Sequence, residues 1–298
     1  MTRSFQTVSL LLLTLFGVNG TLRAEIPDSR WTYPNQAYGK HPRQTLDVWL
    51  PSGETGTVAV VMFVHGGGWT GGSRRDDTAL GLLDKCGWRR CAFVAVEYRF
   101  LADAEAEGIH PPVRAPMEDV NCAVRFVRAH AKEWHLDVNR FGLTGGSAGA
   151  CASLVCAFSD DNALGIRTVA ALWPQTSLDP QEMRAWIPNI SYGARAFGYR
   201  NFEEWLANRN ASLPWIMKYS PTALLEKCSS ARAPRILTDP PVLPPIGSLP
   251  DDPTHAGMFR VKLRDLCARK GVSYAEVKSP EIYSRLIDSL SECVLRKP

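Results

Sequence analysis

The pattern GGSAG at residues 145–149 is the clearest candidate for chemistry, because it places a serine among small residues directly after an apolar run. A strand that turns sharply into a helix there strains the backbone at the serine, and the glycines remove side chains that would collide with neighbouring chain. Ser147 would then project into a cleft, where its hydroxyl becomes a useful nucleophile beside a base. The alternative interpretation is a glycine-rich turn before a helix of small residues.

A second motif, HGGGW at residues 65–69, follows a continuous β-branched run at residues 58–64. Three consecutive glycines let backbone N–H groups turn toward a ligand. Together with the N–H of Ala148, those of Gly67 and Gly68 would hold the oxyanion of a tetrahedral intermediate, a device that contributes about 3 kcal/mol per donor. The two motifs therefore complement each other chemically.

The outer residues of the second motif have separate expected roles. We expect His65 to brace the loop through hydrogen bonds rather than to transfer protons. Trp69 is a predicted substrate-binding residue that either lines the pocket or covers it.

The elements that must position these motifs follow from the apolar pattern. Short apolar runs alternate with helical periodicity from residue 45 onward, which is typical of helices that cover both faces of a mostly parallel sheet. The sequence therefore predicts an α/β fold. Strands are predicted at about 45–50, 58–64, 92–98, 140–144, 168–173, 241–246 and 272–277, and helices at about 116–134, 148–158, 253–270 and from 280 onward.

Residues from about 174 to 240 interrupt the sheet pattern. This predicted insertion is rich in Trp, Asn, Pro and Arg, and it contains Trp186, Trp205 and Trp215. An aromatic-rich insertion between two strands is either a cap over a pocket or a segment that packs away from any pocket. The periodicity of the sequence does not distinguish these two arrangements.

The first residues form a predicted signal peptide, residues 1–24. Its apolar stretch at residues 8–18 is too short to cross a bilayer but has the length of a secretory hydrophobic region, and small residues follow at Gly20 and Ala24. We expect a secreted or periplasmic domain, residues 25–298, with no stable membrane insertion after cleavage. The alternative is an uncleaved membrane anchor.

Composition excludes several classes of protein. The chain of 298 residues is 45% hydrophobic and 21% charged, which excludes disorder, collagen and coiled coil. Lys and Arg number 34 against 30 acidic residues, so nucleic acid is not an expected partner.

The eight cysteines lack the spacing of a zinc site, and no metal is predicted. Cys86 and Cys91 are the predicted local disulfide. We expect Cys122, Cys151 and Cys156 to be small buried hydrophobic residues.

The combined motifs resemble those of secreted α/β-hydrolase esterases. HGGGW, the run YRF at 98–100, and DVNR at 137–140 leading into GGSAG carry the resemblance, which extends over about residues 42–277. The sequence is similar to the bacterial group that contains feruloyl and acetyl-xylan esterases, and to hormone-sensitive-lipase-like carboxylesterases. The resemblance implies an α/β-hydrolase fold, a small or carbohydrate-linked ester as substrate, and no cofactor.

The resemblance also implies roles for individual residues. By this resemblance, Ser147 is the nucleophile, and the backbone of Gly67, Gly68 and Ala148 forms the oxyanion hole. The resemblance also predicts a carboxylate after the strand expected at 241–246.

Asp252, in the run DDPTH, is the best match for that carboxylate, which would orient a histidine and stabilise its imidazolium. Asp252 before Pro253 is also typical of a helix N-cap, an alternative that ranks just behind the catalytic role, and Asp239 and Asp251 are weaker candidates for the acid.

The catalytic base is where the chain departs from this family. The family's histidine follows the last strand, yet no histidine lies beyond residue 255. His255 is the first candidate, but at a helix start three residues after Asp252 we do not expect it to reach Ser147 and Asp252 together. His110 ranks second.

Two functions of different classes follow. The preferred one is an exported serine esterase that acts on acetyl or feruloyl-type esters, with Ser147, Asp252 and His255 as its catalytic residues. The alternative is a catalytically impaired hydrolase-fold protein that binds an ester, sugar or protein and lacks the C-terminal catalytic histidine. A shortened or altered reading frame, whose lost segment contained the base, is a third possibility.

Overall fold

The fold is known from a computed structural model, which describes residues 26–159 and 164–292. The predicted signal peptide and the side chain of Cys293 lie outside the described residues. Within the described part of the chain, no helix has the length and apolar character needed to span a bilayer.

A sheet of eight strands forms the centre, in the order β1-β2-β4-β3-β5-β6-β7-β8. The pairs β1/β2 and β2/β4 are antiparallel, and all the others are parallel. The strands are β1 (Tyr33–Ala37), β2 (Thr45–Trp49), β3 (Val58–Val64), β4 (Ala92–Val96), β5 (Leu136–Gly146), β6 (Ile166–Leu172), β7 (Arg235–Thr238) and β8 (Tyr274–Glu276).

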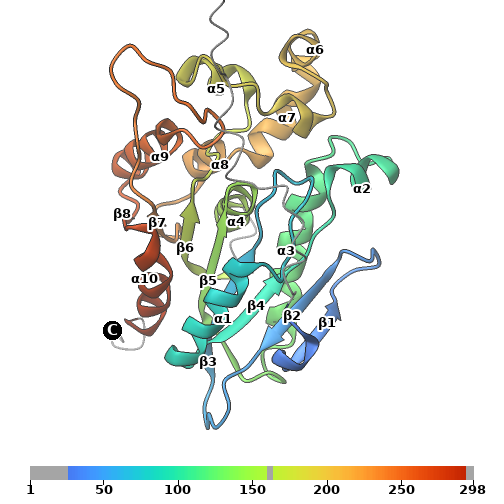
Figure 1. Cartoon of the computed structure of the whole chain (residues 1–298), viewed down its shortest axis with the longest axis vertical. Helices are drawn as coiled ribbons and strands as arrows, with labels where there is room; N and C mark the ends of the chain where they lie inside the picture. The colour runs from blue at the N-terminus through green and yellow to red at the C-terminus, as the bar shows by residue number, and fades with distance from the viewer. Residues whose placement is uncertain (1–25, 160–163, 293–298) are drawn as a thin grey trace, which may run out of the picture.

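Helices cover both faces of this sheet, as the sequence predicts (Figure 1). They are α1 (Asp77–Arg89), α2 (Leu101–Ala106), α3 (Arg114–Ala129), α4 (Ala148–Phe158), α5 (Pro180–Trp186), α6 (Phe202–Ala207), α7 (Arg209–Tyr219), α8 (Pro221–Lys227), α9 (Gly257–Lys270) and α10 (Ser279–Glu292). Short 3-10 helices occur at Asp28–Arg30 and Ala194–Phe197.

The central strand β3 shows why the fold has two apolar cores. Its side chains alternate between the faces, so that Val60 and Met62 pack in the core with α3 and α4, whereas Phe63 packs in the core with α1 and α10. All seven residues of β3 are buried. A strand covered on both faces needs a continuous apolar run, and for that reason its bounds are predicted correctly.

The insertion forms a helical layer at one end of the sheet. Helices α5, α6 and α7 lie beyond the ends of the strands (Figure 1), and Trp205 is fully buried within this layer. The chain returns to the sheet at β7, so the excursion is shorter than the predicted range of 174–240.

The strand predicted at 241–246 is wrong. The fifth parallel strand of the sheet is β7, and the segment after it is an exposed loop in which Val242 is 79% exposed. Four prolines at positions 240, 241, 244 and 245 remove backbone donors from this segment, so it cannot join the hydrogen-bonded ladder.

Two expectations for the cysteines are also wrong. Cys86 and Cys91 are both free thiols, although Cys91 donates its backbone N–H to the carbonyl of Cys86 at 3.0 Å. Cys122 is exposed on α3, because it lies on the polar side of that helix. Cys151 and Cys156 are buried as predicted.

Candidate active site

Ser147 stands on a sharp turn between β5 and α4. Its backbone has φ +53° and ψ −120°, a strained conformation for a residue with a side chain, and its N–H donates to the carbonyl of Leu172 at 2.9 Å. A Cβ atom at Gly149 would lie 2.0 Å from the carbonyl oxygen of Val64, so the turn requires glycine there. The small residues of the motif therefore let α4 pack directly against β3 and hold Ser147 in place.

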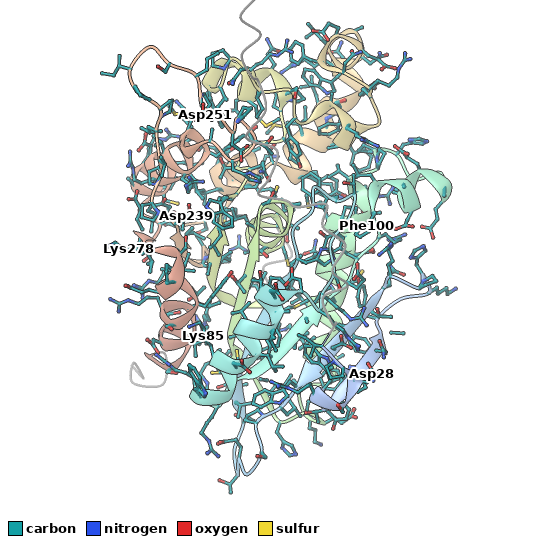
Figure 2. All side chains as sticks on the ribbon, viewed as in Figure 1. Asp28, Lys85, Phe100, Asp239, Asp251 and Lys278 are labelled. Atoms are coloured by element: carbon teal, nitrogen blue, oxygen red, sulfur yellow. The ribbon has the colours of Figure 1, made fainter. Side chains whose placement is uncertain are left out.

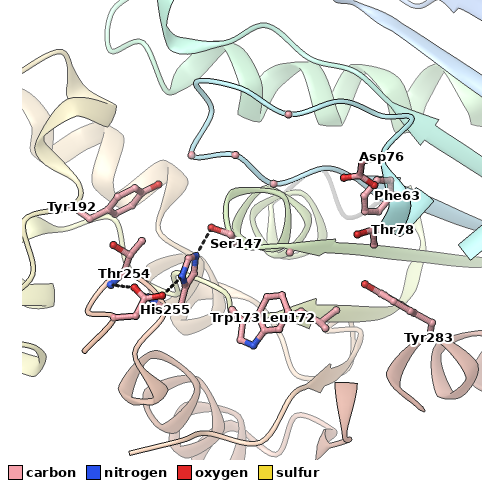
Figure 3. A pocket seen from close by; sticks show the side chains of 16 residues that line it. Phe63, Asp76, Thr78, Ser147, Leu172, Trp173, Tyr192, Thr254, His255 and Tyr283 are labelled. Carbon is pink, nitrogen blue, oxygen red and sulfur yellow. Dashed lines mark hydrogen bonds and ion pairs between the residues drawn. The ribbon is translucent and has the colours of Figure 1, made fainter. Parts of the chain in front are cut away.

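Ser147, His255 and Asp252 are joined by hydrogen bonds (Figure 3). The Oγ of Ser147 lies 2.9 Å from Nε2 of His255, and Nδ1 of the same ring lies 2.6 Å from Oδ2 of Asp252. An ionised carboxylate only accepts hydrogen bonds, so Nδ1 carries the proton and Nε2 accepts from the serine hydroxyl. This is the tautomer that a general base needs.

The expectation that His255 cannot reach both partners is wrong, and the reason is local. Residues 252–255 form a turn in which Oδ1 of Asp252 accepts the N–H groups of Thr254 at 3.1 Å and His255 at 3.3 Å. Helix α9 begins only at Gly257, not at Pro253. The turn places the imidazole of His255 beside the hydroxyl of Ser147, although no histidine follows the last strand.

The electrostatic environment favours an ionised Asp252. Burial raises the pKa of Asp252, but the hydrogen bond from His255 and the positive charge that this ring carries once protonated outweigh burial and leave the pKa below its ordinary value. The carboxylate is therefore ionised at neutral pH and can stabilise an imidazolium beside it.

Two buried side chains support this turn from behind. Gln175 donates to the carbonyl of Thr254 at 2.8 Å, and Nη1 of Arg260 donates to the carbonyl of His255 at 3.4 Å. The Nε of Arg260 lies 3.3 Å from Oδ2 of Asp239. The ion pair of Arg260 and Asp239 links α9 to the end of β7 and fixes the backbone that carries the imidazole.

The weaker candidates for acid and base do not reach the serine. Asp239 is buried at the end of β7 and accepts the N–H of Trp173 at 2.8 Å, whereas Asp251 lies on the outer loop (Figure 2). His110 is exposed and lies against a separate cavity beside Phe197.

The HGGGW loop faces Ser147 across one cavity. Gly67 adopts φ +106°, and a Cβ atom there would lie 2.1 Å from the carbonyl oxygen of Gly71, so only glycine fits. In the described part of the chain, no acceptor pairs with the N–H groups of Gly67 and Gly68. These donors are available to a ligand oxygen at the position where the sequence predicts an oxyanion hole.

His65 braces this loop, as predicted. The ring is fully buried, with Nε2 3.1 Å from Oε1 of Glu97 and Nδ1 2.8 Å from the carbonyl oxygen of Gly66. Tyr98 stacks on the ring and donates its hydroxyl to the carbonyl of His65 at 2.8 Å. The imidazole is thus fully engaged in holding the loop.

Trp69 does not line the cavity. It is 1% exposed and packs against Tyr192, with ring centroids 6.0 Å apart. Trp173, which is 45% exposed at the end of β6, lines the cavity instead. The sequence signal for Trp173 was its place at the end of the strand predicted at 168–173, beside the carboxyl end of the serine-bearing strand.

The cavity has a volume of about 640 Å³. Apolar and aromatic side chains dominate its walls, and polar groups gather at its two ends. Its lining is formed by Phe63, Gly66, Gly67, Gly68, Gly72, Asp76, Thr78, Gly146, Ser147, Leu172, Trp173, Tyr192, Asp252, Thr254, His255 and Tyr283. Among the described residues, no cluster of three or more potential metal ligands occurs.

Comparison with known sequences gives partial matches. Residues 46–190 match the family model described as BD-FAE. A probable isoprenylcysteine alpha-carbonyl methylesterase of Arabidopsis thaliana is 32% identical over 38% of this chain and 22% of its own length. LipM of Mycobacterium tuberculosis, a probable carboxylic ester hydrolase, is 31% identical over 42% of this chain and 28% of its own length. The chain thus spans about a quarter of the length of these curated relatives.

Solved structures match over most of the chain. A truncated form of a carbohydrate esterase from gut microbiota superposes with a TM-score of 0.66 at 15% identity, covering 92% of this chain and all of that one. Esterase B from Lactobacillus rhamnosis gives a TM-score of 0.60 at 16% identity, covering 87% of this chain and 85% of that one. These similarities confirm the predicted α/β-hydrolase fold.

Proposed function

Because this chain has the α/β-hydrolase fold and resembles esterases of the feruloyl and hormone-sensitive-lipase-like group, we propose that it is a serine carboxylic-ester hydrolase. One observation carries the proposal: the hydroxyl of Ser147 is hydrogen-bonded to an imidazole that is itself oriented by Asp252. The esterases among the partial sequence relatives support it at family level.

The first half of the reaction forms an acyl-enzyme. Nε2 of His255 takes the proton of Ser147 as Oγ attacks the ester carbonyl carbon. The carbonyl oxygen becomes an oxyanion, which accepts hydrogen bonds from the N–H groups of Gly67, Gly68 and Ala148. The imidazolium, stabilised by Asp252, then protonates the leaving alkoxide, and the alcohol departs.

The second half reverses these roles. Water loses a proton to Nε2 of His255 and attacks the acyl carbon, and the same oxyanion donors stabilise the second intermediate. Collapse of this intermediate returns the proton to Oγ of Ser147 and releases the carboxylic acid. No step in this sequence needs a cofactor.

We propose acetyl or feruloyl-type esters, small or carbohydrate-linked, as the substrates. The BD-FAE match and the carbohydrate esterase among the structural neighbours support this class. The mostly apolar walls of the cavity suit an acyl group more than a charged ligand. Export to the periplasm or the medium remains part of the proposal and rests on residues 1–24.

Hydrolysis of p-nitrophenyl acetate by the purified protein tests the proposed function. Without its nucleophile the enzyme loses its covalent route, so Ser147→Ala is expected to lower kcat/KM by at least about 10³-fold. Equal rates for the two proteins would remove the enzyme proposal and favour the impaired binding protein.

A further inference from the structure

The cavity continues past Ser147, away from His255, and ends at a second group of polar side chains. Asp76 and Thr78, at the start of α1, and Tyr283 of α10 line that end (Figure 3). Phe63, Leu172 and Trp173 line the walls around this part of the cavity. The reaction proposed above uses none of these residues.

The geometry of that reaction decides which part of an ester would lie there. The imidazole of His255 must protonate the leaving oxygen, so the alcohol part of the ester lies on the side of His255. The carbonyl oxygen points to the N–H groups of Gly67 and Gly68. The acyl group is left to extend along the apolar walls, toward Asp76 and Tyr283.

The carboxylate of Asp76 has unfilled capacity for hydrogen bonds. Its Oδ1 caps α1 by accepting the N–H of Ala79 at 2.9 Å, and burial holds the pKa of the carboxyl above its ordinary value. No Lys, Arg or His side chain among the described residues lies within ion-pair distance of it. The neighbouring Arg74 and Arg75 both point to Asp47, at 2.6 and 2.7 Å.

Tyr283 supplies a hydroxyl of complementary character. Burial, with a further contribution from the charge of Asp76, raises the pKa of Tyr283 to about 12, so the hydroxyl stays protonated at neutral pH. Its oxygen has no hydrogen-bond partner in the part of the chain that the structure describes. An acceptor and a donor thus line the same end of an apolar cavity.

We propose that Asp76 and Tyr283 form an acyl-end subsite that selects acyl groups with a hydroxyl at the end remote from the ester. The ligand hydroxyl donates to the carboxylate of Asp76 and accepts from the hydroxyl of Tyr283, while the apolar walls hold the body of the acyl group. A bond to a charged acceptor makes the larger contribution. This subsite rests on the proposed esterase function, because it defines that enzyme's acyl specificity.

The test compares two esters of equal shape, the p-nitrophenyl esters of 3-(4-hydroxyphenyl)propanoate and 3-(4-methylphenyl)propanoate. The wild type is expected to prefer the hydroxyl ester about tenfold in kcat/KM, the effect of one hydrogen bond to a charged group. Asp76→Asn and Tyr283→Phe are each expected to reduce this ratio to about twofold or less. The ratio is measured within each variant, so a loss of folded enzyme does not change it.

Asp77→Asn is the matched control, since it removes an exposed carboxylate from the same helix start without touching the cavity. It should keep the wild-type ratio. A wild-type ratio near one, or an unchanged ratio in both Asp76→Asn and Tyr283→Phe, would overturn the subsite.

A third ester, with an aminomethyl group in place of the hydroxyl, separates a hydroxyl subsite from a cation subsite. A stronger preference for this ammonium ester than for the hydroxyl ester would overturn the assignment.

Failure of the esterase proposal gives a different result from failure of the subsite. If no Ser147-dependent hydrolysis occurs, calorimetric binding of the two free acids to the Ser147→Ala protein replaces kinetics. Tighter binding of the hydroxyl acid, lost in Tyr283→Phe, supports the subsite even then, and equal binding contradicts it.

Discussion

Ser147 and His255 lie 108 positions apart in the chain, and a different kind of local structure fixes the position of each side chain. The serine depends on close backbone packing, which leaves a recognisable glycine pattern in the sequence. His255 depends on a side-chain turn capped by Asp252, and the run DDPTH is equally typical of a helix start. The serine was therefore predictable from sequence, whereas the reach of the imidazole was not.

Asp252→Asn tests the proposed role of the carboxylate. An amide can present its N–H to Nδ1 and favour the wrong tautomer of His255, so kcat for p-nitrophenyl acetate should fall by about 10²- to 10⁴-fold. Asp251→Asn, on the exposed neighbour, should match the wild type. Equal activities in the two variants would assign the acid to another residue.

At the level of elements, buried ion pairs between distant segments hold the site in place. The pair of Arg260 and Asp239 connects α9 with β7, and Asp47 of β2 binds Arg74 and Arg75 in the segment between the HGGGW loop and α1. Individual residues in these ion pairs have no distinctive spacing in the sequence. Their partners are fixed only by the packing of whole elements, and for that reason sequence patterns did not predict them.

Arg260→Met tests the support behind His255. Removing one partner of a buried ion pair leaves a charge unpaired, so unfolding in urea should show a loss of about 3–5 kcal/mol. The double variant Arg260→Met with Asp239→Asn should recover part of that loss. Arg264→Met, at an exposed site on the same helix, is the control and should change stability much less. A loss no greater than that of this control would contradict the account.

Asp47 provides a test based on pH. Burial raises its pKa, but bonds from Arg75, Asn35 and Arg74 outweigh burial and lower it below the ordinary value. A lowered pKa stabilises the fold above the unfolded-state pKa, and this contribution disappears as the pH falls through the folded-state value. Asp47→Asn should therefore cost about 3 kcal/mol near pH 7 and progressively less below about pH 4.

Urea unfolding across this pH range measures the difference between wild type and Asp47→Asn. Asp28→Asn is the control, because Asp28 also pairs with Arg75 but is exposed. A difference that grows on acidification would contradict the assigned direction.

On the scale of the whole molecule, the sheet and its two helical layers follow from the apolar pattern. Buried strands such as β3 leave continuous apolar runs rich in valine, and α3 leaves a clear helical period. The short β7 at Arg235–Thr238 leaves only a weak apolar pattern, so we predicted that strand in the proline-rich loop that follows it. The architecture was thus more predictable than the segments after β6, which carry the proposed acid and base.

The free cysteines give a prediction for the whole fold. Among the described residues, Cys86, Cys91, Cys122, Cys151 and Cys267 are free thiols, and the apolar cores around them are held by packing. The midpoint of thermal unfolding should be the same with and without dithiothreitol. A drop of several degrees on reduction would show that a disulfide contributes.

If His255 acts as the base for Ser147, the rate of covalent labelling by a fluorophosphonate depends on this imidazole. The hydroxyl oxygen attacks phosphorus and fluoride leaves, so intact-protein and peptide mass spectrometry report both the rate and the residue. We expect rapid labelling of Ser147 in the wild type and in His110→Gln, and labelling at least about 10²-fold slower in His255→Gln. Labelling of His255→Gln at the wild-type rate, or at a residue other than Ser147, would contradict this expectation.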